Sequence, residues 1–145
     1  MQDTSGVHVW LVLGKAFHAL AAHAEATLNL SGAGLGDSDF RVLEVLLHKG
    51  SLPVNTIGPK VWLTPGSISV AVDRLEKKAL VKRMNTDDRR VRLVELTAKG
   101  RTLITRISRE HAAAMEVAAS VLSKDERLIL LRLLKRLGKG GVDES

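Results

Sequence analysis

The stretch "WLTPGSISVAVDRLEKKALVKRMNTDDRRVRLVELTAKG", residues 62–100, decides the fold of this chain. Thr64 is a favoured helix N-cap residue, and Pro65 after it has the fixed φ angle that suits the first position of a helix. Apolar side chains then recur at spacings of four and three residues, as they do along one buried face of a helix. These are Ile68, Val72 and Leu75. The pattern predicts a helix over residues 65–78.

A β-hairpin is predicted directly after this helix. Residues 80–84 (LVKRM) and 90–96 (RVRLVEL) are rich in strand-forming side chains, and residues 85–88 (NTDD) between them are typical of a turn. In the second strand, the side chains expected to face the core are Val91, Leu93 and Leu96.

Before this stretch, the sequence predicts a short extended segment before Pro53 and then a short helix over residues 54–61, although Gly58 and Pro59 weaken the helix. The turn WLTP, residues 62–65, joins it to the helix over residues 65–78. Two helices joined by a tight turn and followed by a two-stranded ribbon make a winged helix-turn-helix. Such a unit places its second helix in the major groove of DNA.

Further helices make the predicted fold mainly α with a small β-hairpin wing. Their ranges are 7–28, 39–49, 98–122 and 124–137. The last one opens with a capping box formed by Ser123 and Glu126. No linker long enough to divide the chain occurs, so residues 1–145 are predicted to form one domain. Its predicted parts are a winged-helix lobe at about 36–97 and long helical segments at 6–30 and 98–138.

Composition narrows the classes of protein that fit. The 145 residues contain no cysteine, which excludes disulfides, thiolate catalysis and the usual zinc ligands. No apolar run approaches the ~20 residues of a membrane-spanning helix, and the N-terminus lacks the features of a signal peptide. We therefore expect a soluble cytoplasmic protein with no membrane contact.

Positive charge is concentrated in one part of the chain. The net charge is +6, and residues 73–92 hold eight basic and four acidic side chains, hence +4 of that total. A local basic field suits nucleic acid as a partner. The alternative is a basic solvated face, which is common among soluble proteins.

The exposed face of the helix over residues 65–78 carries the side chains that we predict to contact DNA. They are Gly66, Ser67, Ser69, Val70, Asp73, Arg74 and Lys77. Small and hydroxyl side chains near the helix N-terminus permit close approach to base edges, and Val70 suits a thymine methyl group. Arg74 and Lys77, one turn further on, are placed for phosphates. The alternative is that Ser and Gly occur there only because they cap the helix.

The hairpin tip supplies three more predicted DNA contacts, Asp88, Arg89 and Arg90. A narrow tip can enter a minor groove, where the concentrated negative potential attracts arginine. Asp88 is expected to accept hydrogen bonds from Arg90 and to hold its guanidinium outward. The alternative is an ordinary salt-bridged turn with no role in binding.

Two other classes of function compete with DNA binding. The five histidines show no metal-ligand spacing and no nucleophile motif occurs, so neither an enzyme nor a metal or cofactor site is expected. A winged helix that binds only proteins is the second alternative, since one fold can host both functions. The tip arginines Arg89 and Arg90 and the local charge of +4 argue against it.

The chain resembles the MarR-type family of bacterial transcriptional regulators. The matching motifs are the run DRLEKKALV from Asp73 to Val81, the pair Asp88 and Arg90, and the strand end Leu96-Thr97-x-x-Gly100. Helical segments before and after extend the resemblance over nearly the whole chain. Ala79, where the family usually has glycine, and Pro59 depart from the pattern.

The resemblance implies a homodimer whose first and last helices interdigitate and which binds a pseudo-palindromic operator in double-stranded DNA. A partner chain would also explain why residues 7–28 are apolar on nearly every side. The resemblance further implies a repressor that is released by a small aromatic or phenolic effector.

The effector is expected to bind between the dimerisation helices and the DNA-binding lobe. The candidate lining residues are Trp10, Phe17, His18 and His111. For Trp10 and Phe17 the alternative is a place in the core or in the dimer interface. The run VWLTPGSISVAVDRLE is similar to that of family members that control aromatic and quinone detoxification.

Overall fold

The computed structural model describes residues 1–139, which form six helices and a three-stranded antiparallel sheet. The helices are α1 (Gly6–Leu30), α2 (Asp37–Lys49), α3 (Val54–Val61), α4 (Pro65–Lys77), α5 (Ala98–Ala119) and α6 (Lys124–Lys139). The strands are β1 (Leu52–Pro53), β2 (Val81–Asn85) and β3 (Arg92–Leu96). The predicted fold, mainly α with a β-hairpin wing, is confirmed. The assignment of residues 1–145 to one domain stays a prediction, and residues 140–145 lie outside the described part.

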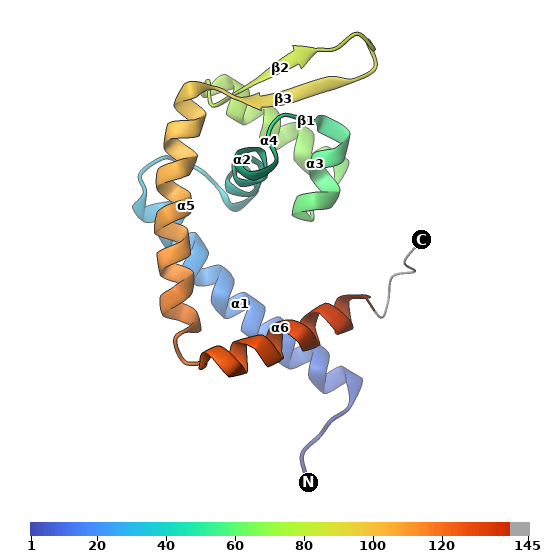
Figure 1. Cartoon of the computed structure of the whole chain (residues 1–145), viewed down its shortest axis with the longest axis vertical. Helices are drawn as coiled ribbons and strands as arrows, with labels where there is room; N and C mark the ends of the chain where they lie inside the picture. Colours follow the sequence, from blue (N-terminus) through green and yellow to red (C-terminus); the bar gives the residue numbers. More distant parts are fainter. Residues whose placement is uncertain (140–145) are drawn as a thin grey trace.

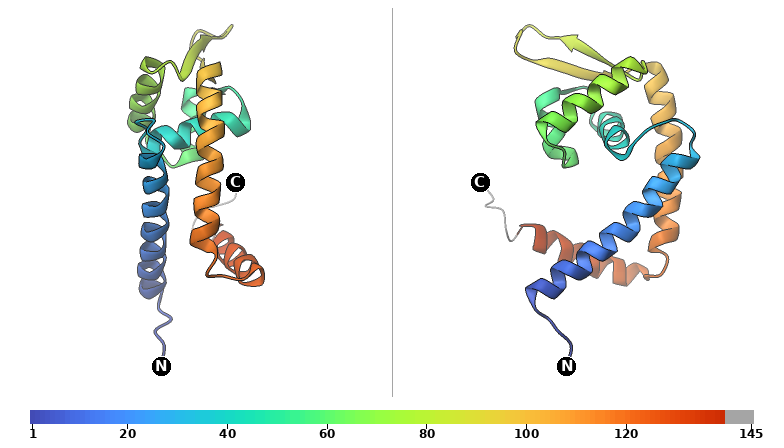
Figure 2. Two further views of the ribbon diagram at one scale, coloured as in Figure 1. Left: turned by 90° about the vertical axis from the view of Figure 1, so that its left-hand side faces the viewer. Right: turned by 180° about the vertical axis from the view of Figure 1, so that it is seen from behind.

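The elements are arranged in two parts along the long axis of the molecule (Figure 1). At one end α2, α3, α4 and the sheet form the lobe, from which the hairpin β2–β3 projects. α5 leads from the lobe to α6 at the opposite end, and α1 contacts both α5 and α2. Figure 2 shows the same separation between α6 and the lobe from two further sides. Within residues 1–139, no helix has both the length and the apolar character required to cross a membrane.

The hydrophobic core lies in the lobe and takes in the first half of α5. The predicted core residues Ile68, Val72 and Leu75 of α4 are all buried, as are Phe40, Leu43 and Leu46 of α2. Ile104 and Ile107 attach α5 to the same cluster. By contrast, α1 buries only Leu28, and none of the residues of α6 is buried. The long helices therefore leave the core rather than enclose it.

The sheet differs from the prediction in which face of β3 is buried. The short extended segment predicted before Pro53 forms β1, which pairs with β3 at Leu93 and Val94, and proline is tolerated in β1 because that strand lies at the sheet edge. In β3 the buried side chains are Val94 and Leu96, whereas Leu93, and Val91 just before the strand, are only half-buried. Because side chains alternate between faces with a period of two, the prediction for Leu93 was wrong by one residue.

The predicted helix caps are present as hydrogen bonds. The Thr64 hydroxyl accepts from the backbone N–H of Ser67 at 3.2 Å. Ser123 and Glu126 form the reciprocal capping box, with N–H to carboxylate at 2.9 Å and N–H to hydroxyl at 3.2 Å. The bond from the Ser123 N–H lowers the pKa of the Glu126 carboxyl. These caps fix where α4 and α6 begin.

The junction between α4, β2 and α5 brings two backbone segments unusually close. The Thr97 hydroxyl donates to the Ala79 carbonyl at 2.7 Å and accepts from the Gly100 N–H at 3.0 Å, and the Thr97 N–H donates to the Leu80 carbonyl at 3.1 Å. A Cβ on Gly100 would overlap the carbonyl oxygen of Leu80, so only glycine fits. Ala79 has φ of 59°, a left-handed conformation that favours glycine.

We expect Ala79→Gly to raise the free energy of unfolding by about 1 kcal/mol, because glycine removes the Cβ strain of the left-handed conformation. The matched opposite change, Gly100→Ala, should lower it by at least about 2 kcal/mol, because the backbone of Leu80 must move. Urea denaturation at one fixed protein concentration measures both. An Ala79→Gly variant that is no more stable than the parent would contradict this account of the junction.

Candidate nucleic-acid interface and adjoining cavity

The N-terminal half of α4 presents small side chains to solvent. Gly66, Ser67, Ser69 and Val70 are exposed, and Val70 keeps 53% of its surface accessible. Ser67 also belongs to the cap, since the Thr64 hydroxyl donates to the Ser67 hydroxyl at 3.0 Å. The helix N-terminus carries a partial positive charge and its small side chains permit close approach, so this surface suits a polyanion with exposed base edges.

Arg74 has a different environment from the one that its position predicts. Its Nε and Nη2 both donate to Oδ1 of Asp39, at 3.2 and 2.9 Å, and Asp39 is 3% exposed. The other Asp39 oxygen accepts from the Gly36 N–H at 3.1 Å. A buried carboxylate needs such a partner, so Arg74 fastens α4 to α2. Sequence spacing could not indicate this ion pair, and the phosphate contact of Arg74, whose side chain stays 47% exposed, remains a prediction.

Asp73 and Arg83 connect α4 to the wing. The Arg83 guanidinium, one fifth exposed, binds Asp73 at 2.7 Å and Glu76 at 2.9 Å, and its backbone N–H also donates to Glu76 at 3.3 Å. Burial works against the charged form of Arg83, but the bonds and charges of the two carboxylates outweigh it and raise its pKa. Asp73 is therefore engaged with the wing, and the orientation of β2 relative to α4 is fixed by three side chains.

The wing tip is ordered by local hydrogen bonds. The Thr86 hydroxyl donates to the carbonyls of Asp88 at 2.7 Å and Val91 at 2.9 Å. The Asp88 carboxylate accepts from the backbone N–H of Arg90 at 3.0 Å and not from its guanidinium, so the predicted side-chain bond is wrong. The reason is geometric, because an Asp side chain in a tight turn reaches the N–H two residues on. Asp88 shapes the loop, and the side chains of Arg89 and Arg90 project into solvent.

The basic side chains of residues 73–92 divide into two groups. Those bound within the chain are Arg74, Lys78, Lys82 and Arg83. Those with no side-chain partner in residues 1–139 are Lys77, Arg89, Arg90 and Arg92. The unpaired cations thus lie at the C-terminal end of α4 and on the wing, on either side of Arg83. They are available for an external anion.

A cavity of about 830 Å³ lies between α1, α2, the end of α3 and α5. Its aromatic lining residues are Phe17, Phe40, Trp62 and His111. The rings of Phe40 and His111 are 4.8 Å apart and tilted by 55°. Trp62 is a left-handed C-cap of α3, with φ of 57° and 81% exposure, two residues before the Thr64 cap of α4. The cavity wall is therefore continuous with the turn that carries α4.

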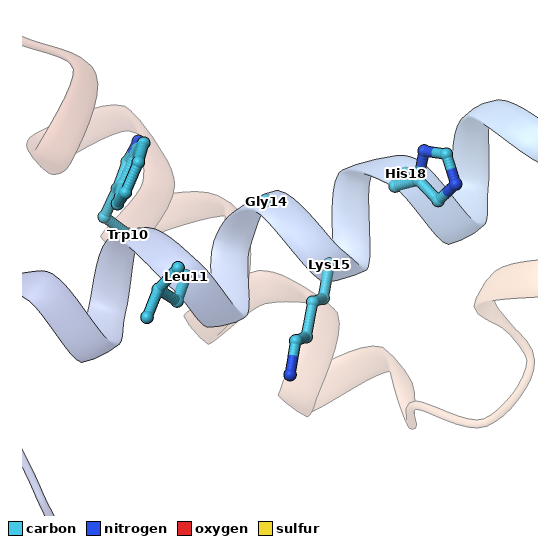
Figure 3. A pocket seen from close by; sticks show the side chains of 5 residues that line it. All are labelled: Trp10, Leu11, Gly14, Lys15 and His18. Atoms are coloured by element: carbon cyan, nitrogen blue, oxygen red, sulfur yellow. The ribbon is translucent and has the colours of Figure 1, made fainter.

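The four candidate effector residues do not meet at one place. Phe17 and His111 both line the cavity. Trp10 and His18 line a separate depression on α1, which Figure 3 shows to be built from that helix alone, with Trp10 pointing up and Lys15 down in the view. Sequence patterns did not indicate Trp62 as a lining residue, although a tryptophan in an exposed interhelical turn is itself an unusual feature.

Comparison with known proteins identifies the group to which this fold belongs. The MarR family model matches residues 35–91. The HTH-type transcriptional regulator MhqR of Bacillus subtilis is 37% identical over 131 residues, which are 90% of this chain and 89% of MhqR. Sco3205 of Streptomyces coelicolor, a MarR family regulator solved in complex with DNA, has a TM-score of 0.86 and 23% identity, with 100% of this chain and 93% of Sco3205 covered. NadR, solved with 4-hydroxyphenylacetate, has a TM-score of 0.74 and 26% identity, with coverage of 96% and 97%.

Within residues 1–139, no group of three or more His, Cys, Asp or Glu side chains could hold a metal ion. The match to MhqR extends well beyond the winged helix, into the long terminal helices. This chain belongs to the MarR family of transcriptional regulators, and it is a DNA-binding regulator rather than an enzyme.

Proposed function

We propose that this protein is a cytoplasmic repressor that binds a pseudo-palindromic operator as a homodimer and leaves it when a small aromatic effector occupies the cavity. The observation that carries the proposal is the position of the unpaired cations. Lys77 follows the exposed small-residue surface of α4, and Arg89, Arg90 and Arg92 lie on the wing beside it. One duplex could contact both elements at once.

The proposed contacts assign different grooves to the two elements. Gly66, Ser67, Ser69 and Val70 would enter the major groove, with Lys77 on the phosphates. Arg89 and Arg90 would enter the adjacent minor groove, where arginine is attracted electrostatically. Arg83 would keep the two contacts in register, because it is bound to α4 from β2.

The exposed apolar surfaces of α1 and α6 support the proposal of a homodimer. Their exposed large apolar side chains include Val7, Trp10, Leu11, Val12, Phe17, Leu128, Ile129, Leu131, Leu133 and Leu137. A monomer would leave this surface in water, which is unfavourable and favours association. Two copies related by a two-fold axis could bury these faces against each other.

The position of the cavity supports the proposal that an effector binds there. It lies where α1 and α5 meet the lobe, and its wall includes the residue Trp62 close to the start of α4. NadR, of similar fold, was solved with 4-hydroxyphenylacetate. A ligand that contacts Trp62 could shift the position of α4, the helix that follows. It would do so only if it bound the DNA-binding and the non-binding positions of α4 with different affinity.

Substitutions in the wing should separate direct contact from positioning. Arg90→Ala removes one cation from each wing, so the slope of log affinity for operator DNA against log salt should fall by up to roughly 2 per dimer. Asp88→Ala removes the acceptor for the Arg90 N–H and loosens the tip, so it should lower affinity without lowering that slope. Titrations at several salt concentrations measure both effects.

Arg106→Ala is the matched control for the wing, because Arg106 lies on α5 and is paired with Glu110 at 3.2 Å. It removes a cation of the same kind without altering the wing and should leave both affinity and slope nearly unchanged. Unchanged affinity for Arg90→Ala would mean that the wing does not contact DNA.

The oligomeric state should depend on α6. Light scattering at micromolar concentration should show a dimer, and Leu131→Glu should disrupt it, because a charge at an apolar interface is costly. Val70→Glu, the same kind of change on the exposed face of α4, should leave the dimer intact and abolish operator binding. A folded, monomeric parent protein would contradict the proposed dimer.

A further inference from the structure

Charge and hydrogen-bonding groups in the cavity indicate which class of aromatic compound it accepts. We infer that the cavity selects neutral hydroxylated aromatic compounds over aromatic carboxylates, with Glu44 as the acceptor for a ligand hydroxyl. This inference rests on the proposed effector function and specifies the ligand class. It depends on the aromatic walls, the pairing of Arg41 and the unpaired state of Glu44.

The walls are suited to an aromatic ring. The whole sequence contains two Phe and two Trp residues, and three of these four, Phe17, Phe40 and Trp62, line the one cavity. Met115 and the His111 ring add polarizable surface. Aromatic pairs gain free energy beyond simple area burial, so such a concentration favours a planar ring as the ligand.

The arginine at the cavity is already engaged within the chain. Arg41 Nη2 binds Asp37 at 2.8 Å, and Nη1 donates to the Val61 carbonyl at 2.6 Å. Its Nε is buried beneath the surface and has no partner in the described residues. A ligand carboxylate would have to compete with Asp37 for this guanidinium, whose charge Asp37 already balances.

Glu44, unlike Arg41, is not engaged by another side chain of the described residues and can bind a ligand group. It lines the cavity, is half-buried, and has no hydrogen-bond or ion-pair partner within residues 1–139. A carboxylate accepts hydrogen bonds and cannot donate them when ionised, so it matches a hydroxyl donor. The buried Nδ1 of His111 is also unpaired, and a buried polar atom without a partner carries an energetic cost that a hydroxyl or water could relieve.

The lysines at the cavity do not reverse this preference. Lys49 and Lys60 both line it, but both are exposed to solvent. Water and salt screen the charge of such groups, whereas the half-buried Glu44 is screened less. A ligand anion would therefore meet its strongest unpaired electrostatic contact in a carboxylate of like charge.

The test compares two probes of nearly the same size and shape, the anionic 4-hydroxyphenylacetate and the neutral 4-hydroxyphenylacetamide. The full-length Trp10→Phe variant leaves Trp62 as the single tryptophan, so its fluorescence reports binding in the cavity, and calorimetry provides a second measurement. The amide should bind about tenfold more tightly than the acid, as expected for one partly screened like-charge contact. Glu44→Gln should bring the two affinities to within about twofold, because it removes the charge.

Glu110→Gln is the matched control, because it removes a carboxylate of α5 that lies outside the cavity and should preserve the tenfold ratio. The inference is overturned if the acid binds as tightly as the amide, if Glu44→Gln leaves the ratio unchanged, or if neither probe binds at millimolar concentration. Operator binding by the same preparations is measured in parallel. Intact operator binding with any of these results would contradict the ligand class while leaving the proposed DNA-binding function in place.

Discussion

A single copy of this chain cannot bury the apolar faces of α1 and α6, and the rest of the architecture depends on that constraint. α6 has no buried residue and α1 buries only Leu28, although α1 is rich in leucine, valine and alanine and α6 is rich in leucine. Full burial of one leucine or valine is worth about 1.5–3 kcal/mol, so a second copy that covers these faces would supply a large part of the stability of the assembly. The same association would set the distance between two copies of α4.

Charged side chains serve two separate purposes in the lobe. Arg74 with Asp39, and Arg83 with Asp73 and Glu76, hold α4 against α2 and against the wing. The charges of Arg74 and Arg83 are balanced by carboxylates of the same chain. The positive electrostatic field of the lobe therefore comes from residues such as Lys77 and Arg90, which project from defined positions. The rigid placement of a few unpaired cations is what allows contact with phosphates to be combined with contact with bases.

Sequence patterns predicted the elements because the relevant interactions are local. Caps at Thr64, Thr97 and Ser123 are decided within three residues, and the apolar spacing of α4 is decided within one helix. The role of Arg74 could not be predicted, because its partner lies 35 positions earlier in the chain. The shape of the cavity is likewise a tertiary property. Glu44 and Trp62 have no local signature of a binding site, and they line one cavity only because α2 and the end of α3 pack beside α5.

In the proposed dimer, two copies of α4 held at a fixed spacing would contact DNA symmetrically. Selection of bound duplexes from a random pool by the full-length protein tests this symmetry. We expect enrichment of a two-fold symmetric sequence with half-sites about one helical turn apart, ~10 bp centre to centre. Enrichment of an unsymmetric single site, or of no sequence at all, would contradict it.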